Sequence, residues 1–276
     1  MLYLVATPIG NLEDITLRAL KVLNSVEILA CEDTRNTQKL LNHYEITGKK
    51  LISYHEHNEE KTSEKIISYL EEGREVALVT DAGMPCISDP GYILVEKIKK
   101  AGLPITTLPG ANAGLTALVA SGIESYNYTF YGFLPRKSKD LKLKLEEILK
   151  MNTTSILYES PYRVKNLVEE ISKISPTRKI SVARELTKMF EQIETSSAEE
   201  ILEMLGNKIK EKGEFVVIIS PNKDEKSEEV NVDELVELIY KKVQSGVKKS
   251  EAIKNIAKEF GINKKEVYSL YHEKYD

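Results

Sequence analysis

The chain has 276 residues, of which 41% are hydrophobic and 30% are charged, with a formal net charge of −4. This composition excludes an intrinsically disordered chain, and the acidic balance is unfavourable for nonspecific nucleic-acid binding through overall charge. No segment reaches the roughly 18 apolar residues of a membrane span, and no basic leader is present, so we expect a cytoplasmic protein without membrane contact.

Apolar runs alternate with amphipathic segments through the first 120 residues. Strands are expected at residues 2–6, 28–31, 51–54, 76–79 and 105–108. Helices are expected to follow them at residues 15–24, 34–44, 60–72, 92–101 and 113–120. Because strand and helix alternate regularly, the sequence predicts an α/β lobe over residues 1–121 with a largely parallel, covered sheet.

The alternation is interrupted at residues 121–127, which are expected to lead into a second α/β lobe over residues 122–220. Its strands are expected at residues 129–132, 155–158, 179–183 and 215–219. Its helices are expected at residues 140–149, 164–171 and 198–205. The polar stretches between these elements favour antiparallel connections in this lobe.

The last part of the chain differs in character from the two lobes. A charged linker from Pro221 to Glu229 precedes a helical tail over residues 231–276, with helices expected at 232–244, 249–260 and 264–271. Residues 257–268 have a glycine between two helical stretches, as in a helix-turn-helix. Two interpretations stay open: a tail that contacts nucleic acid, and a small three-helix domain that only packs on itself.

Three loops of small residues follow strands of the first lobe. They lie at residues 7–11, 80–91 and 108–114, and they contain glycine, proline and alanine. The carboxyl ends of parallel strands meet at one edge of a sheet, and glycine lets the backbone approach a ligand closely. The three loops therefore predict one shared ligand cleft.

Charged residues stand at other strand ends. Glu32, Asp33 and Arg35 follow the second strand, where they either act as proton acceptors and orienting groups or cap the next helix. Residues 158–163 and 184–188 are similar exits in the second lobe. They form either structural salt bridges or the charged rim of a cleft for a polar, anionic substrate.

Other motifs carry less information. The sequence has no dinucleotide fingerprint and no phosphate-binding P-loop. We interpret His55, Glu56 and His57 as hydrogen-bonding groups of a loop, and we expect no metal. Cys31 and Cys86 are expected to be free thiols. The basic cluster at residues 136–144 is either part of an RNA path or a solvated helix face.

Several longer motifs, taken in order, resemble one family. They are TPIGN at 7–11, CEDTR at 31–35, HEHNE at 55–59, VTDAGMPCISDPG at 79–91, LPGANA at 108–113, FYGFLPRK at 130–137, YESPYR at 158–163 and ARELTK at 183–188. With them, residues 1 to about 220 resemble the ribosomal RNA small subunit methyltransferase I family, in the tetrapyrrole methylase-like class of S-adenosylmethionine (SAM) enzymes. Relatives acting on tetrapyrroles have GDP where this chain has DAG at 81–83, which favours the RNA branch.

The resemblance implies the two-lobed class III methyltransferase fold, usually as a homodimer, with SAM bound between the lobes. The implied activity is 2′-O-methylation of a cytidine in the decoding region of 16S rRNA, within the small ribosomal subunit. By motif position, SAM contacts are expected from Pro8, Gly10, Thr80, Asp81, Ala82, Gly83, Ile87, Asn112, Ala113, Tyr158 and Ala183. Catalytic roles are expected for Glu32, Asp33, Arg35 and Lys188, with Arg35 and Lys188 holding phosphate or ribose.

Two other functions stay open. SAM-dependent methylation of a tetrapyrrole or another small molecule would need a deep apolar substrate pocket and no RNA. A non-catalytic protein that binds nucleic acid through the helical tail would show no SAM affinity.

Overall fold

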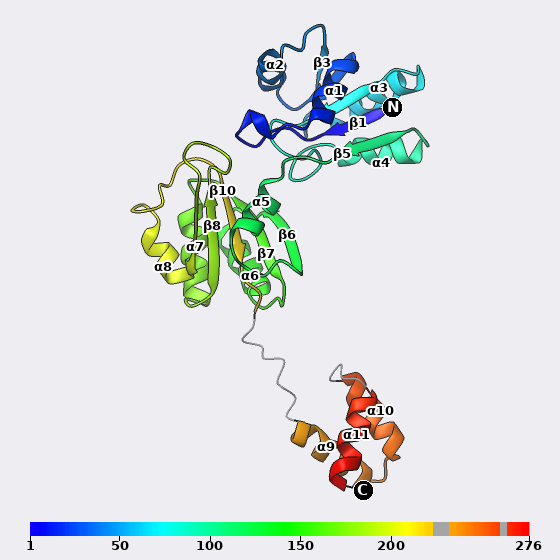
Figure 1. The fold of residues 1–276 in the computed structure, drawn as a ribbon, viewed down its shortest axis with the longest axis vertical. Helices are drawn as coiled ribbons and strands as arrows, with labels where there is room; N and C mark the ends of the chain where they lie inside the picture. The colour runs from blue at the N-terminus through cyan, green and yellow to red at the C-terminus, as the bar shows by residue number, and fades with distance from the viewer. Residues whose placement is uncertain (223–231, 260–263, 276) are drawn as a thin grey trace. The chain divides into compact units, whose positions relative to one another are not determined.

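A computed structural model of the chain describes residues 1–222, 232–259 and 264–275 (Figure 1). Met1–Pro221 form one compact unit, and Asn222–Asp276 form a second. Most of the expected charged linker, and the glycine turn at residues 260–263, lie outside the described residues. Within the described ranges, none of the helices combines the length and the apolar composition needed to cross a bilayer.

The first sheet has five strands in the order β3-β2-β4-β1-β5, and all its pairings are parallel. The strands are β1 (Leu2–Val5), β2 (Ile28–Cys31), β3 (Lys50–Ser53), β4 (Val76–Val79) and β5 (Ile105–Leu108). Every residue of β2 and β4 is buried, which explains their continuous apolar runs. The predicted parallel sheet is confirmed.

Helices cover both faces of this sheet. On one face α1 (Leu17–Ser25) and α2 (Thr34–His43) pack through Leu23 and Leu41. On the other face α3 (Glu59–Glu71) and α4 (Tyr92–Lys100) pack through Ile66 and Leu94. A short 3₁₀ helix, η1 (Leu12–Asp14), follows the β1 loop. Side chains of one strand alternate between the two cores, since successive residues point to opposite faces.

The second sheet is mixed, with the order β6-β7-β10-β8-β9. Its strands are β6 (Tyr128–Phe133), β7 (Thr154–Glu159), β8 (Lys179–Arg184), β9 (Gln192–Ser197) and β10 (Phe215–Ile219). Only β6 and β7 pair in parallel among these strands, so the expected antiparallel connections are confirmed. Strand β9 was not predicted, because its half-buried sequence QIETSS lacks an apolar run.

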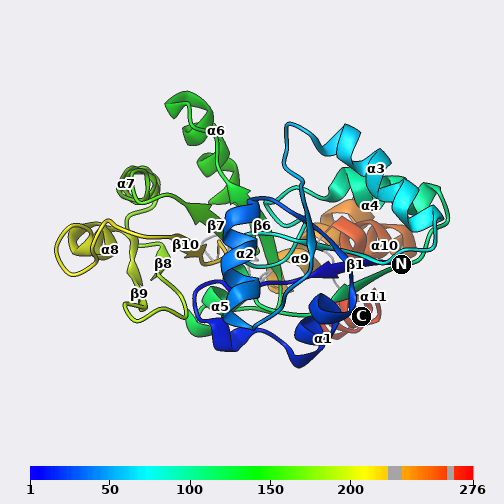
Figure 2. The same cartoon turned by 90° about the horizontal axis from the view of Figure 1, so that it is seen from above.

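One face of the second sheet carries α6 (Ser138–Ile148), α7 (Val164–Ile174) and α8 (Ala198–Met204), which lie side by side (Figure 2). The other face is covered by α5 (Ala113–Ala120), whose Ala117 and Leu118 pack against Ile156 and Ile218. Helix α5 therefore follows a strand of the first sheet but packs on the second.

The described residues of the second unit form α9 (Val232–Gln244), α10 (Lys249–Glu259) and α11 (Lys264–Tyr275). Ile239, Ile253, Ile256 and Val267 are buried together in a core of their own. The predicted tail helices are confirmed, and their contact with nucleic acid stays a prediction.

Candidate active site

A cavity of about 410 Å³ lies where the two sheets meet. This volume is within the range of roughly 300–1,000 Å³ for small-molecule sites. Its walls come from Ile9, the loop Asp81–Asp89, Asn112, Ala113, Phe133, residues 158–161, Leu186 and residues 213–216. Loops of both lobes thus line one site, which we call the main cleft.

Two loops of the first lobe are joined at the edge of the cleft. The backbone N–H of Thr7 donates to the carbonyl of Gly83 at 2.9 Å, and the N–H of Gly83 donates to the carbonyl of Thr7 at 3.0 Å. Gly83 has a φ of +86°, which a residue with a side chain rarely adopts. The glycine therefore lets the chain turn and pair with the first loop while it exposes backbone to the cleft.

The loop after β4 is held in an uncommon conformation. Cys86 and Ser88 have φ values of +71° and +64°, and neither is glycine. The N–H of Gly91 donates to Glu59 at 2.7 Å and anchors the end of the loop. Such backbone persists only where the surroundings hold it, and it is common at functional sites. Here it places Asp89 in the cleft wall.

Asp89 belongs to a group of three carboxylates with Glu32 and Asp81. Burial raises the pKa of Asp89 to about 7, and the negative charges of Glu32 and Asp81 contribute. Burial also raises the pKa of Glu32, with a further contribution from Asp81. Glu32 does not line the cleft. At neutral pH, Asp89 therefore exchanges a proton more readily than an ordinary carboxylate.

Asp33 and Arg35 form a surface pair beside this group. The Arg35 guanidinium donates to both carboxylate oxygens of Asp33, at 3.1 and 2.6 Å. Asp33 is also the N-cap of α2, because its carboxylate accepts a hydrogen bond from the backbone N–H of Arg35 at 2.8 Å. These hydrogen bonds lower the pKa of Asp33 to about 2. Asp33 is therefore a weak proton acceptor, and the arrangement favours the capping interpretation.

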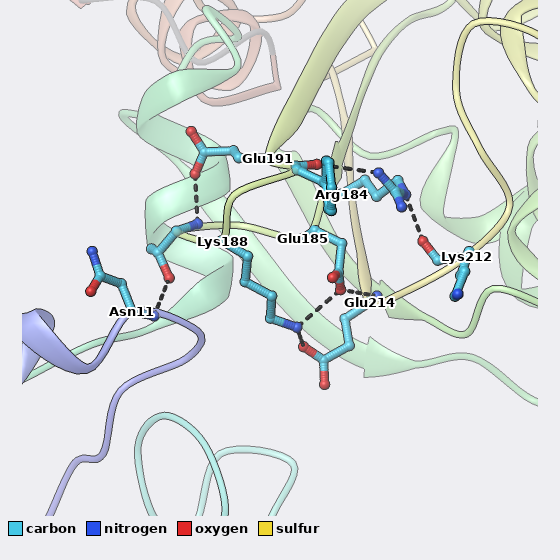
Figure 3. A network of polar contacts seen from close by, with 9 residues as sticks. Asn11, Arg184, Glu185, Lys188, Glu191, Lys212 and Glu214 are labelled. Carbon is cyan, nitrogen blue, oxygen red and sulfur yellow. Dashed lines mark hydrogen bonds and ion pairs between the residues drawn. The ribbon is translucent and has the colours of Figure 1, made fainter. Parts of the chain in front are cut away.

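Lys188 lies at the rim of the cleft in the second lobe (Figure 3). Its ammonium donates to Glu185 at 2.9 Å and to Glu214 at 2.8 Å. Burial lowers the pKa of Lys188, but the two hydrogen-bonded ion pairs outweigh burial, so the net shift is upward. Lys188 therefore stays charged and fixes the loop before β10 to the loop after β8.

The same rim touches the first lobe. The backbone N–H of Asn11 donates to the Thr187 hydroxyl at 3.0 Å. A side chain at position 10 would place its Cβ 2.5 Å from Lys188 Cγ and 2.9 Å from the Leu186 carbonyl oxygen. Gly10 does not line the cleft. Glycine is needed at this position because a side chain would prevent the close approach of the two lobes.

The other residues expected to contact SAM divide into three groups. Those that line the main cleft are Asp81, Ala82, Gly83, Ile87, Asn112, Ala113 and Tyr158. Pro8 and Thr80 line a smaller cavity next to it, which also includes Asp81. Ala183 is buried in the core beneath α5 and lines neither cavity.

Several cleft residues were missed from the sequence. Asp89 could have been predicted, because it lies in the small-residue loop at 80–91 that follows a strand. Residues 213–216 had no such signal, because they come before a strand or begin it rather than follow one. Phe133 ends a strand that was predicted to stop at residue 132. Glu159 was not missed, because it belongs to the charged exit at 158–163, although its strand was predicted to stop at residue 158.

Glu159 is a buried carboxylate in the wall of the cleft. One carboxylate oxygen accepts a hydrogen bond from the Ser160 N–H at 2.7 Å. The other lies 3.3 Å from the Arg163 guanidinium, yet it has no hydrogen-bond donor in the described part of the chain. The side chain is only 1% exposed, so its charge is compensated inside the cleft wall by the ion pair with Arg163.

Residues 1–202 match the family described as Tetrapyrrole (Corrin/Porphyrin) Methylases. The chain is 45% identical to Ribosomal RNA small subunit methyltransferase I of Halalkalibacterium halodurans and 44% identical to the protein of that name in Bacillus subtilis, each over 99% of this chain and 94% of the relative.

Solved structures share the fold of the first unit. The methyltransferase CobJ superposes with a TM-score of 0.59 at 18% identity, over 80% of this chain and 94% of that one. Diphthine synthase gives a TM-score of 0.58 at 12% identity, over 79% and 89%. At these identities the likeness shows the fold and leaves the substrate open.

Proposed function

The chain belongs to the ribosomal RNA small subunit methyltransferase I family of tetrapyrrole methylases, and from this premise we propose that it methylates small-subunit ribosomal RNA with SAM as donor. The acceptor we propose is the 2′-hydroxyl of a cytidine in the decoding region of 16S rRNA. The observation that carries the proposal is the cleft between the two sheets, with its carboxylates and aromatic rings, in a chain so similar to those relatives.

The cleft residues fit a cationic methyl donor. Asp81, Asp89, Glu159 and Glu214 place carboxylates around it, which favour an ammonium and a sulfonium group. The rings of Phe133 and Tyr158 lie 5.8 Å apart between centroids, and aromatic faces attract cations.

When bound, SAM supplies a methyl group on a positively charged sulfur. In the transfer the ribose oxygen forms a bond to the methyl carbon, the carbon–sulfur bond breaks, and the hydroxyl proton is released. The chain's task is alignment and removal of that proton, because a ribose hydroxyl is a weak nucleophile. Ile87, Leu186 and Val216 give the cleft apolar walls that exclude water.

Asp89 is the group best placed to take the proton. Asp89 lines the cleft, and its carboxylate accepts a hydrogen bond from the side chain of Thr80. Thr80 lines the neighbouring cavity. Glu32 acts on Asp89 through charge. Asp33 holds Arg35, which is 85% exposed and therefore available to an RNA phosphate. Lys188 is engaged by two carboxylates and closes the rim.

The partners belong to the same proposal. A ribosomal substrate would place the protein in the cytoplasm, beside small subunits. A homodimer is supported by apolar side chains left open on α5, where Leu115 and Val119 are 44% and 81% exposed. Arg136 and Lys137 are exposed three and four residues after the cleft residue Phe133, so they would offer two positive charges to RNA beside the cleft.

The test is methyl transfer from labelled SAM to small ribosomal subunits that lack the modification, with naked 16S rRNA alongside and the labelled nucleotide mapped. We expect label on a single ribose 2′-oxygen in the decoding region. Binding of SAM without label in either RNA sample would contradict the proposal and favour a small-molecule acceptor. Absence of SAM binding, measured by calorimetry, would overturn our assignment of the cleft.

A further inference from the structure

A second cavity, of about 180 Å³, adjoins the main cleft. It is lined by Thr7, Pro8, Leu12, Asn36, Thr37, Lys39, Leu40, Thr80 and Asp81. Asp81 lines both cavities, so the two share a wall. The second cavity lies at the carboxyl edge of the parallel sheet, between the β1 loop, α2 and the end of β4. We call it the side pocket.

The side pocket contains a buried hydroxyl without a strong partner. Thr37 is 3% exposed, and its Oγ1 makes no hydrogen bond of normal geometry within the described ranges. The Cys31 thiol is a hydrogen-bonding partner of this hydroxyl, but a thiol is a weak hydrogen-bonding group. Buried hydroxyls are usually satisfied, so the free capacity of Thr37 indicates a ligand group in the pocket.

The wall common to both cavities is rigid. One oxygen of Asp81 accepts a hydrogen bond from the Asn36 side chain at 2.8 Å, and the other accepts from the Asp33 N–H at 3.2 Å. The side-chain amide of Asn36 therefore donates one hydrogen to Asp81, and its carbonyl oxygen stays available to another partner. A group in the side pocket would thus meet a fixed carboxylate with the main cleft behind it.

A positive charge stands at the same pocket. Asn36, Lys39 and Leu40 have the three- and four-residue spacing that places side chains on one face of α2. Lys39 is exposed, and across the residues that the structure describes it forms no ion pair. Its ammonium is therefore available to an anionic ligand, of which an RNA phosphate is the simplest example.

The size of the side pocket limits what it can hold. Its volume lies below the range of roughly 300–1,000 Å³ for pockets that hold drug-sized ligands. A tetrapyrrole macrocycle is too large for it, whereas part of one nucleoside is not. RNA-binding sites of this kind take nucleotides that are single-stranded or turned out of a helix.

We propose that the side pocket takes the acceptor nucleoside of the RNA, with Asp81 at the border that the side pocket shares with the donor cleft, Asn36 and Thr37 bonding to the nucleoside, and Lys39 contacting its phosphate. This inference rests on the proposed function. It assigns the two substrates of one transfer to two adjoining cavities, so that the methyl carbon and the ribose oxygen meet at the edge formed by Thr80 and Asp81.

The test uses full-length variants and small ribosomal subunits as the probe. Lys39→Glu is expected to raise the KM for subunits about tenfold and to lower the slope of log affinity against log salt by about one, with SAM affinity unchanged. Lys65→Glu is the matched control, because Lys65 is an exposed lysine on α3, which covers the opposite face of the sheet. It should keep the wild-type KM.

Thr37→Val tests the buried hydroxyl with almost no change of shape. If the hydroxyl bonds to the nucleoside, kcat/KM falls about tenfold while the melting temperature and SAM affinity stay the same. Wild-type kcat/KM for both Thr37→Val and Lys39→Glu would overturn the inference. That result differs from failure of the proposed function, in which the wild-type protein itself labels no RNA.

Discussion

The two sheets present different ends of their strands to the cleft. In the first sheet all strands run in one direction, so loops after β1, β2, β4 and β5 gather at one edge. In the second sheet β10 runs against its neighbours, and Phe215 pairs with both Glu159 and Arg184. There the ends of β7 and β8 meet the beginning of β10. A parallel sheet therefore concentrates loops of one kind, whereas a mixed sheet combines strand ends with strand starts.

The two edges also differ in chemistry. The first contributes the three carboxylates Glu32, Asp81 and Asp89, two of which have a raised pKa. The second contributes the rings of Phe133 and Tyr158 and an ion-paired rim. We infer that the first edge handles the proton and the second encloses the donor. Three experiments test this division, in order of expected effect.

Asp89→Asn should give the largest loss. Removing the proton acceptor is expected to lower kcat by about 10²- to 10⁴-fold. SAM affinity should fall much less, because other carboxylates of the cleft still face the cationic donor. Glu214→Gln is the matched control, since it neutralises a cleft carboxylate on the other edge and should reduce kcat less than tenfold. Single-turnover methylation of small subunits would measure both. Equal losses would show that the two edges do not divide the work as we infer.

The pH dependence of turnover should be the next largest effect. Only the charged carboxylate of Asp89 accepts a proton, and its pKa is raised to about 7. The rate is therefore expected to fall about tenfold per pH unit below that value and to level off above it. The pH profile of kcat/KM checks this, because kcat/KM reports the pKa values of the free enzyme. The Asp89→Asn variant should lack the inflection, and a wild-type profile that is flat from pH 5.5 to 8.5 would argue against Asp89.

The smallest effect is expected at the rim. Lys188 and Glu214 are 30% and 75% exposed, so their coupling in a double-mutant cycle should be about 1 kcal/mol or less. Lys188→Met keeps the side-chain stem and should weaken SAM binding by a few fold without changing the pH profile. Lys144→Met removes a similar pair with Glu147 on α6 and should leave SAM binding alone. A change in the pH profile of Lys188→Met would assign Lys188 to proton transfer.

Much of the architecture was predictable because apolar runs mark buried strands. The runs at 76–79 and 215–219 are observed as β4 and β10. Strand β9 escaped prediction because an edge strand half exposed on both faces needs no apolar pattern. The loops of the parallel sheet were predictable as a group, since the order of the chain alone brings their ends together.

The rest of the site depends on packing that local sequence does not encode. Gly213 and Glu214 reach the cleft only because β10 lies between β7 and β8 and runs against both. Ala183 was expected at the ligand, but the pleat of β8 turns it toward α5 and into the core. The low pKa of Asp33 depends on its hydrogen bonds with Arg35, and the raised pKa of Asp89 depends mainly on burial, with a contribution from the charge of Glu32.

Helix α5 has a mechanical consequence. It is fixed to the second sheet, while the strand before it, β5, is fixed to the first. Any rotation between the sheets must therefore be absorbed by the short connection at residues 109–112. In that connection, the side-chain oxygen of Asn112 accepts a hydrogen bond from the Leu115 N–H at 2.9 Å and so caps α5. Asn112 also lines the cleft. A ligand bound against Asn112 would restrict the movement of this connection. Opening of the two lobes would then be coupled to release of the demethylated donor.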